Sequence, residues 1–195
     1  MQATRGTPIT AGSAKLAGRN RLRWLFALVA VGGLATDVVT KAIVVSSLDP
    51  ASPVRLLGGA LTLRLIRNPG AAFSVGEHFT FVFALLSVAV LTFVVAKLVP
   101  RIGHPGWAVA LGLLAAGVAG NLTDRLFRRP GVLRGHVVDF FQLPHFAIFN
   151  FADMCITGAA VMIMILAVIK NVAISGEHYA RVRPEHKSEL KSDDG

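Results

Sequence analysis

Residues 152–169 read ADMCITGAAVMIMILAVI, an apolar run in which Asp153 is the only charged residue. An α-helix rises about 1.5 Å per residue and the hydrocarbon core of a bilayer is about 30 Å thick, so a run of this length can cross a membrane. Three earlier runs share this character, at about 24–46, 79–99 and 107–122. The sequence therefore predicts an all-α membrane protein whose four transmembrane helices form one domain, residues 24–170.

The composition agrees with a protein embedded in lipid. Of the 195 residues, 53% are apolar and only 16% are charged, against about 25% charged in a typical soluble domain. The net charge of +9 is also found in proteins that bind nucleic acid, but here the basic residues flank the apolar runs, where they meet lipid headgroups. We therefore expect membrane lipids, and no nucleic acid, as partners.

The distribution of lysine and arginine predicts the orientation. Twelve lie in the terminal segments and the turn at 97–106, and seven lie in the two opposite loops, about 48–78 and 123–151. Because positive charge favours the cytoplasmic side, both termini are expected in the cytoplasm. Residues 1–23 are expected to form a disordered basic cytoplasmic arm and residues 171–195 a cytoplasmic tail.

The first outer loop carries a signal for a small sheet. Val54–Leu57 and Ala60–Ile66 alternate in character and are separated by Gly58-Gly59, which is typical of a β-hairpin. We expect this sheet to lie on the outer surface of the membrane.

Ionisable residues inside the spans are costly, at about 2.5–3.5 kcal/mol each near the centre, so each requires a reason. Asp37 and Lys41 are four residues apart and share a helix face, as an ion pair that fixes packing or that positions a catalytic group. Asn121 and Asp124 share a face of the third span, and Arg125 is placed to hold a carboxylate. A structural ion-pair cluster explains these residues as well as a functional site does.

Two further carboxylates have contrasting surroundings. Asp139 lies between two valines and two phenylalanines, so partial desolvation favours its protonated form. Asn150 and Asp153 fit the N-cap and N3 positions of a capping box, where the positive end of the helix favours a charged carboxylate. One carboxylate of each kind suits acid–base chemistry and is the arrangement of aspartic proteases, although capping alone also explains Asp153. These arguments leave open whether Asp124 or Asp139 is its partner.

A metal site and a transport function are the alternatives. His136 and His145 lie near these aspartates, but no HExxH pattern or other ligand spacing is present, so we do not expect a metal site. A proton-coupled carrier would use several of the same acidic and basic groups as a relay. Four spans without an internal repeat disfavour that alternative.

Five stretches in this order resemble the bacterial lipoprotein signal peptidases, or signal peptidase II, over roughly residues 24–170. They are Asp37-Val-Val-Thr-Lys41, Arg67-Asn-Pro-Gly-Ala-Ala-Phe73, Gly120-Asn-Leu-Thr-Asp-Arg125, Val137-Val-Asp-Phe140 and Phe149-Asn-Phe-Ala-Asp153. The resemblance implies an aspartic endopeptidase of the bacterial inner membrane that removes signal peptides from prolipoproteins, cleaving before a diacylglyceryl-modified cysteine. It also implies four transmembrane helices with a small extracytoplasmic β-cradle and a short amphipathic helix on that side.

The resemblance further implies roles for single residues. It assigns the catalytic pair to Asp139 and Asp153, and so decides between Asp139 and Asp124. Supporting or substrate-binding roles follow for Asp37, Lys41, Asn68, Gly70, Asn121, Asp124, Arg125, Asn150 and Ala152. The enzyme is expected to be a monomer that acts on diacylglyceryl-modified prolipoproteins near the outer leaflet, without a metal or a cofactor. The stretch from Asp139 to Asp153 is short for this family.

Overall fold

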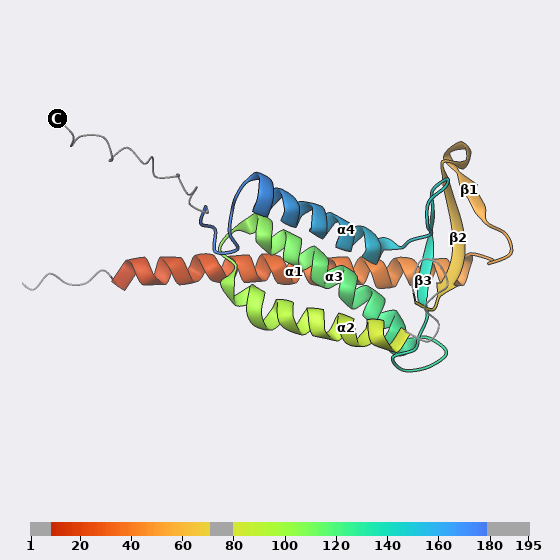
Figure 1. The fold of residues 1–195 in the computed structure, drawn as a ribbon, viewed down its shortest axis with the longest axis horizontal. Helices are drawn as coiled ribbons and strands as arrows, with labels where there is room; N and C mark the ends of the chain where they lie inside the picture. Colours follow the sequence, from red (N-terminus) through yellow and green to blue (C-terminus); the bar gives the residue numbers. More distant parts are fainter. Residues whose placement is uncertain (1–8, 71–79, 179–195) are drawn as a thin grey trace, which may run out of the picture.

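Four helices run side by side and a small sheet covers one end of them (Figure 1). The structure is a computed structural model that describes residues 9–70 and 80–178, with side chains from residue 16 onward. The helices are α1 (Ile9–Ser47), α2 (Thr80–Phe93), α3 (Pro105–Phe127) and α4 (Phe151–Met164). Two of them continue in tighter or wider turns: α2 through Val94–Leu98 and Val99–Arg101, and α4 through Ile165–Ile169. The predicted fold class, helical with four membrane spans and a small sheet, is confirmed.

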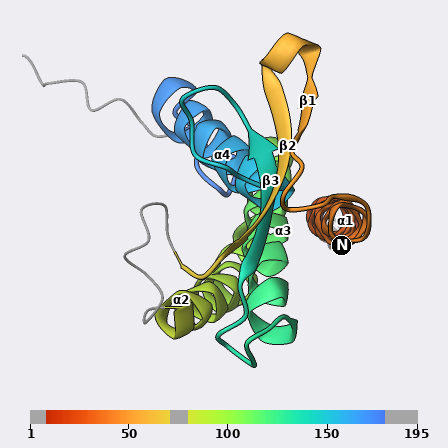
Figure 2. The same ribbon diagram turned by 90° about the vertical axis from the view of Figure 1, so that its right-hand side faces the viewer.

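Helix α3 lies at the centre of the bundle, with α1, α2 and α4 around it (Figure 2). All four helical segments are long and apolar enough to cross a membrane, and 61% of the residues in the apolar window of α3 are buried, against 11–22% in the other three. The outer helices therefore present most of their apolar side chains to lipid. The buried face of α3 is where charged groups can be paired away from lipid.

Glycines let the helices approach α3 closely. A Cβ atom at Gly117 would meet the backbone of Ala152 and the side chain of Ile156, and one at Gly120 would meet the carboxylate of Asp37. Small residues at such crossings are typical of membrane helix packing. They bring α1 and the first turn of α4 to the same end of α3, close to the sheet.

The sheet has three antiparallel strands in the order β1-β2-β3. They are β1 (Val54–Leu56), β2 (Leu61–Asn68) and β3 (Val137–Gln142). The predicted hairpin is confirmed: Gly58 and Gly59, with φ of 67° and 98°, lie in the turn between β1 and β2. Strand β3 comes from the segment between α3 and α4 and pairs with β2 so that Asp139 is opposite Ile66.

Three boundaries differ from the predicted ones. Helix α1 begins at Ile9, so much of the arm expected to be disordered is helical; residues 16–23 are rich in good helix formers, and Arg19 donates to the carbonyl oxygen of Pro100. Helix α3 continues past the predicted end at residue 122 to Phe127, because Asp124 is neutralised by cations instead of ending the helix. Residues 171–178, expected as tail, fold back on the bundle, where Trp107 Nε1 donates to Val172 O at 3.0 Å.

Other predictions fall outside the described residues. These include the first eight residues of the arm, the end of the Arg67–Phe73 stretch, and the tail from residue 179. Within the described ranges no short amphipathic helix is found beside the sheet.

Candidate active site

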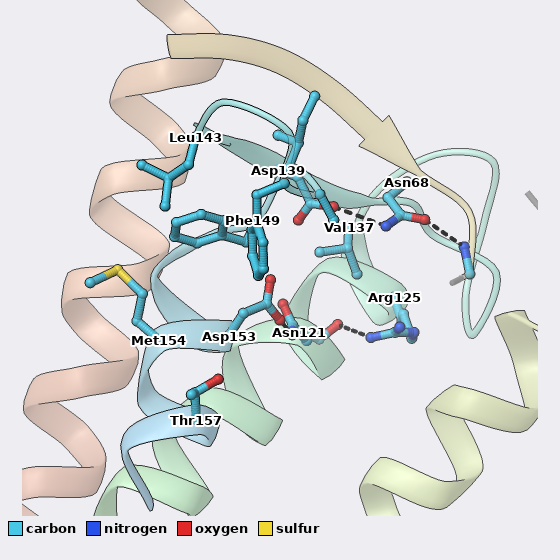
Figure 3. A pocket seen from close by; sticks show the side chains of 14 residues that line it. Asn68, Asn121, Arg125, Val137, Asp139, Leu143, Phe149, Asp153, Met154 and Thr157 are labelled. Carbon is cyan, nitrogen blue, oxygen red and sulfur yellow. Dashed lines mark hydrogen bonds between the residues drawn. The ribbon is translucent and has the colours of Figure 1, made fainter. Parts of the chain in front are cut away.

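Asp139 lies on β3 and is held by two amide side chains. Its Oδ2 accepts from Asn68 Nδ2 at 2.9 Å and its Oδ1 accepts from Asn150 Nδ2 at 2.6 Å. Asn68 is itself oriented by Gly70, whose backbone N–H donates to Asn68 Oδ1 at 3.0 Å (Figure 3). The sequence motif that contains Asn68 and Gly70 therefore fixes one oxygen of the Asp139 carboxylate.

Burial changes the acidity of Asp139. The residue is 3% exposed, and this desolvation raises the pKa of its carboxyl group from 3.8 to about 6. The bonds from Asn68 and Asn150 oppose the rise, whereas the nearby negative charge of Asp153 adds to it. The predicted preference of Asp139 for its protonated form has this physical basis.

Asp153 lies in the first turn of α4 and forms the predicted capping box. Its backbone N–H donates to Asn150 Oδ1 at 3.0 Å, and its Oδ2 accepts from the backbone N–H of Asn150 at 3.1 Å. The other oxygen, Oδ1, accepts from Asn121 Nδ2 at 2.9 Å, so α3 also positions this carboxylate.

Asn150 connects the two aspartates. Its side chain is fully buried and donates to Asp139, while its backbone donates to Asp153. The same Nδ2 atom lies 3.2 Å from Asn121 Oδ1. One asparagine thus links a carboxylate on a strand to a carboxylate on a helix, and both side chains face the same space (Figure 3).

A buried ion cluster lies behind this pair. Lys41 Nζ is 2.8 Å from Asp37 Oδ2, 2.9 Å from Asp124 Oδ2 and 3.1 Å from Asn121 Oδ1. Asp37 Oδ1 accepts from the backbone N–H of Ala152 at 2.9 Å, next to Asp153. The predicted pair of Asp37 and Lys41 is confirmed, and it both packs α1 and supports the first turn of α4.

Asp124 belongs to an ion-pair cluster, as one of the two interpretations of the sequence expected, whereas Arg125 has other partners. Asp124 pairs with Lys41 and Arg128, and its Oδ2 also accepts from the backbone N–H of Val138 at 3.1 Å, which attaches β3 to α3. Among the described residues Arg125 pairs with no carboxylate: its Nη1 donates to Asn121 O at 3.1 Å, and its guanidinium carbon lies 5.8 Å from the Phe83 ring centroid. The expectation that Arg125 holds a carboxylate is therefore not met among the described residues, where its guanidinium contacts α3 and the Phe83 ring of α2 instead.

The two aspartates open into a cavity of about 670 Å³ with a mostly apolar lining. Leu143, Phe149, Met154 and Thr157 line it beside Asn68 and Arg125 (Figure 3). The sequence did not predict these lining residues, since scattered residues in a loop and on an apolar helix do not by themselves indicate a binding site. The only available indication was the cluster of phenylalanines between residues 140 and 151.

The described residues include no group of three or more histidine, cysteine, aspartate or glutamate side chains that could hold a metal ion. His136 and His145, considered above as ligands, do not line the cavity. The geometry offers a pair of carboxylates held by neutral amide donors, and burial raises the pKa of one of them, Asp139, to about 6. This arrangement suits acid–base activation of a water molecule.

Comparison with known proteins agrees with this chemistry. Residues 29–169 match the family described as signal peptidase (SPase) II. The chain belongs to this family. Its relatives include the lipoprotein signal peptidases of Streptomyces coelicolor, 45% identical over 77% of this chain and 72% of the relative, and of Streptomyces griseus, 42% identical over 83% of each.

A solved structure supports the same assignment. A bacterial membrane enzyme determined by the in meso method at 2.3 Å resolution has a TM-score of 0.60 and 27% identity, covering 80% of this chain and 94% of its own. As a signal peptidase II, the protein is a multi-pass bacterial membrane enzyme and an aspartic peptidase that acts on prolipoproteins. The expected family, fold and activity are confirmed. The family is one of peptidases and not of proton-coupled carriers.

Proposed function

We propose that Asp139 and Asp153 are the catalytic pair with which this signal peptidase II cleaves prolipoproteins before a diacylglyceryl-modified cysteine. The observation that carries the proposal is the bridge through Asn150, which donates to both carboxylates beside one apolar cavity. The supporting residues expected from the sequence hold this pair: Asn68 and Gly70 from β2, Asn121 from α3, and Asp37, Lys41 and Ala152 behind α4.

The two carboxylates share one proton and act on one water molecule. Asp139 holds the proton more readily, because burial raises its pKa to about 6, and donates a hydrogen bond to the scissile carbonyl oxygen. Asp153 accepts a proton from the water as its oxygen attacks the carbonyl carbon. The tetrahedral intermediate then collapses: the C–N bond breaks and the departing cysteine amine takes a proton from the pair.

The apolar cavity lining supports a lipidated substrate. The apolar signal segment and the two acyl chains would contact side chains such as Leu143, Phe149 and Met154, while the peptide bond reaches the aspartates at the sheet end. Binding energy from these remote contacts orients the reacting groups. In this proposal the sheet end lies at the outer leaflet, both termini are in the cytoplasm, and the enzyme works as a monomer among membrane lipids.

The test is cleavage of a diacylglyceryl-modified prolipoprotein by the purified full-length protein. We expect Asp139→Asn and Asp153→Asn each to lower kcat by at least about 10³-fold, within the range that acid–base groups contribute. Asp49→Asn, the same change at an exposed aspartate outside the cavity, serves as the control and should keep wild-type turnover. Near-normal turnover of either site variant would contradict the proposal, as would loss of wild-type activity on adding a metal chelator.

A further inference from the structure

A second cavity lies at the end of the bundle opposite the sheet. Its volume is about 950 Å³, and its walls come from α1, the turn after α2, and the segment that follows α4. Arg19 and Arg21 line it from α1, and Arg101 lines it from the turn. Figure 1 shows that α1 projects beyond the ends of the other three helices on this side of the bundle. The cavity shares no residue with the catalytic one.

The charge around this cavity is strongly positive. The described side chains of this end comprise six basic residues and one acidic residue: Arg19, Arg21, Arg23, Lys97, Arg101, Lys170 and Glu177. None of these six basic side chains forms a salt bridge with another described residue. The three salt bridges of the described part of the chain all lie at the opposite end of the bundle, near the sheet. Three of the arginines and Glu177 line the cavity itself, so the charge of its lining remains positive and favours an anion.

Two of the arginines also fix the shape of the cavity. Arg19 donates to the carbonyl oxygen of Pro100, and Arg23 Nη2 lies 3.5 Å from the same oxygen. These contacts attach α1 to the turn after α2. Arg21 and Arg101, on the two attached elements, then face the cavity without a hydrogen-bond partner among the described residues. A planar guanidinium group binds phosphate oxygens in a two-pronged fashion, so this pair suits a phosphate.

The position along α1 indicates what carries the phosphate. Trp24, Leu28 and Val31 are 76%, 71% and 66% exposed, and their spacing of four and three residues places them on one helix face. Arg21, three residues before Trp24, begins the same stripe. An exposed tryptophan next to arginines is typical of the level where lipid headgroups meet acyl chains. A molecule bound at Arg21 would thus lay its apolar part along this stripe.

We propose that this cavity binds the headgroup of an anionic phospholipid, with the phosphate at Arg21 and Arg101 and the acyl chains along Trp24, Leu28 and Val31. The site is separate from the peptidase reaction. In the orientation proposed above it faces the cytoplasmic leaflet, and the bound lipid joins the projecting part of α1 to the turn after α2.

The test is lipid binding to the full-length protein in a neutral detergent, followed by native mass spectrometry. The probes are phosphatidylglycerol, phosphatidylcholine with the same acyl chains, and inorganic phosphate. We expect phosphatidylglycerol to bind at one site, and the double variant Arg21→Gln/Arg101→Gln to bind it about 30-fold more weakly, equivalent to about 2 kcal/mol for two arginines. Arg55→Gln/Arg64→Gln removes the same charge from exposed positions on the sheet and should bind as the wild type does.

A second measurement needs no variant. Bound phosphatidylglycerol should protect Arg21 and Arg101 of the wild type from an arginine-modifying reagent, and leave Arg55 and Arg64 reactive. Equal binding of phosphatidylcholine, or an equal loss in both double variants, would overturn the proposal in favour of unspecific attraction. Binding of inorganic phosphate as tight as that of the lipid would show a simple anion site and would overturn the assignment to a phospholipid.

Discussion

Replacing Asp139 by asparagine should stabilise the folded protein at neutral pH while it removes activity. Desolvation by burial raises the pKa of the Asp139 carboxyl group from 3.8 to about 6. A difference of this size corresponds to about 3 kcal/mol at about 1.4 kcal/mol per pH unit. The folded wild type is destabilised by this amount when Asp139 is ionised. The Asp139→Asn variant avoids this loss, because asparagine has no charge to desolvate.

The sign follows from proton binding. Because the folded state holds the proton of Asp139 more tightly than the unfolded state does, the free energy of unfolding falls as pH rises from about 3.8 to about 6 and is then constant. Asparagine removes this dependence. It also loses one of the two hydrogen bonds accepted from Asn68 and Asn150, at about 1 kcal/mol at every pH. The diagnostic quantity is therefore the change with pH, not the offset.

The assay is thermal unfolding in detergent at a series of pH values from about 4 to about 7.5. Relative to the wild type, Asp139→Asn should gain about 2 kcal/mol in the free energy of unfolding between the two ends of this range, because at pH 4 part of the change has already occurred. Asp49→Asn is the matched control at an exposed aspartate. A difference between wild type and Asp139→Asn that is the same at both ends would refute the argument. It would show that the carboxylate is well solvated in the folded protein.

Two further substitutions probe the packing that supports the site, both followed by thermal unfolding at constant pH. Lys41→Met should lower the free energy of unfolding by about 3–5 kcal/mol, because it leaves Asp37 buried without its cation, whereas Lys97→Met at an exposed position should have little effect. Gly120→Ala should lower the free energy of unfolding by about 1–3 kcal/mol, since its methyl group would meet Asp37. In Gly158→Ala the new Cβ would have only a contact at 3.9 Å, so this variant should raise the free energy of unfolding by up to about 1 kcal/mol. Equal behaviour within either pair would contradict this account of the packing.

Most of the fold could be predicted from local sequence patterns. The apolar runs predicted the spans because a membrane-crossing helix satisfies its backbone internally, and Gly58-Gly59 predicted the turn of the hairpin because both residues adopt positive φ. The capping box of Asn150 and Asp153 was likewise readable, since its partners are three residues apart. Each of these features depends on residues that are neighbours in the sequence.

Long-range contacts were not readable in this way. Asn68 donates to Asp139 across 71 positions, and Asn121 donates to Asp153 across 32, so no spacing rule predicts either bond. The choice between Asp124 and Asp139 depended on the same kind of contact, and only the family resemblance pointed to Asp139. The contacts of Arg125 with Phe83 of α2 and with the Asn121 carbonyl oxygen were likewise not predictable from the residues around it in the sequence.

The two kinds of carboxylate in this protein differ in what neutralises them. Asp37 and Asp124 lie inside the spans and pair directly with Lys41, and these ion pairs serve packing. Asp139 lies on a strand outside the spans, and its described hydrogen-bond donors are neutral amides that orient it without fixing its charge. A cation in direct contact would hold Asp139 permanently ionised and remove the proton that the proposed mechanism requires. Capping and catalysis are compatible at Asp153 for a related reason, because the cap occupies one oxygen from the backbone and leaves the carboxylate facing the cavity.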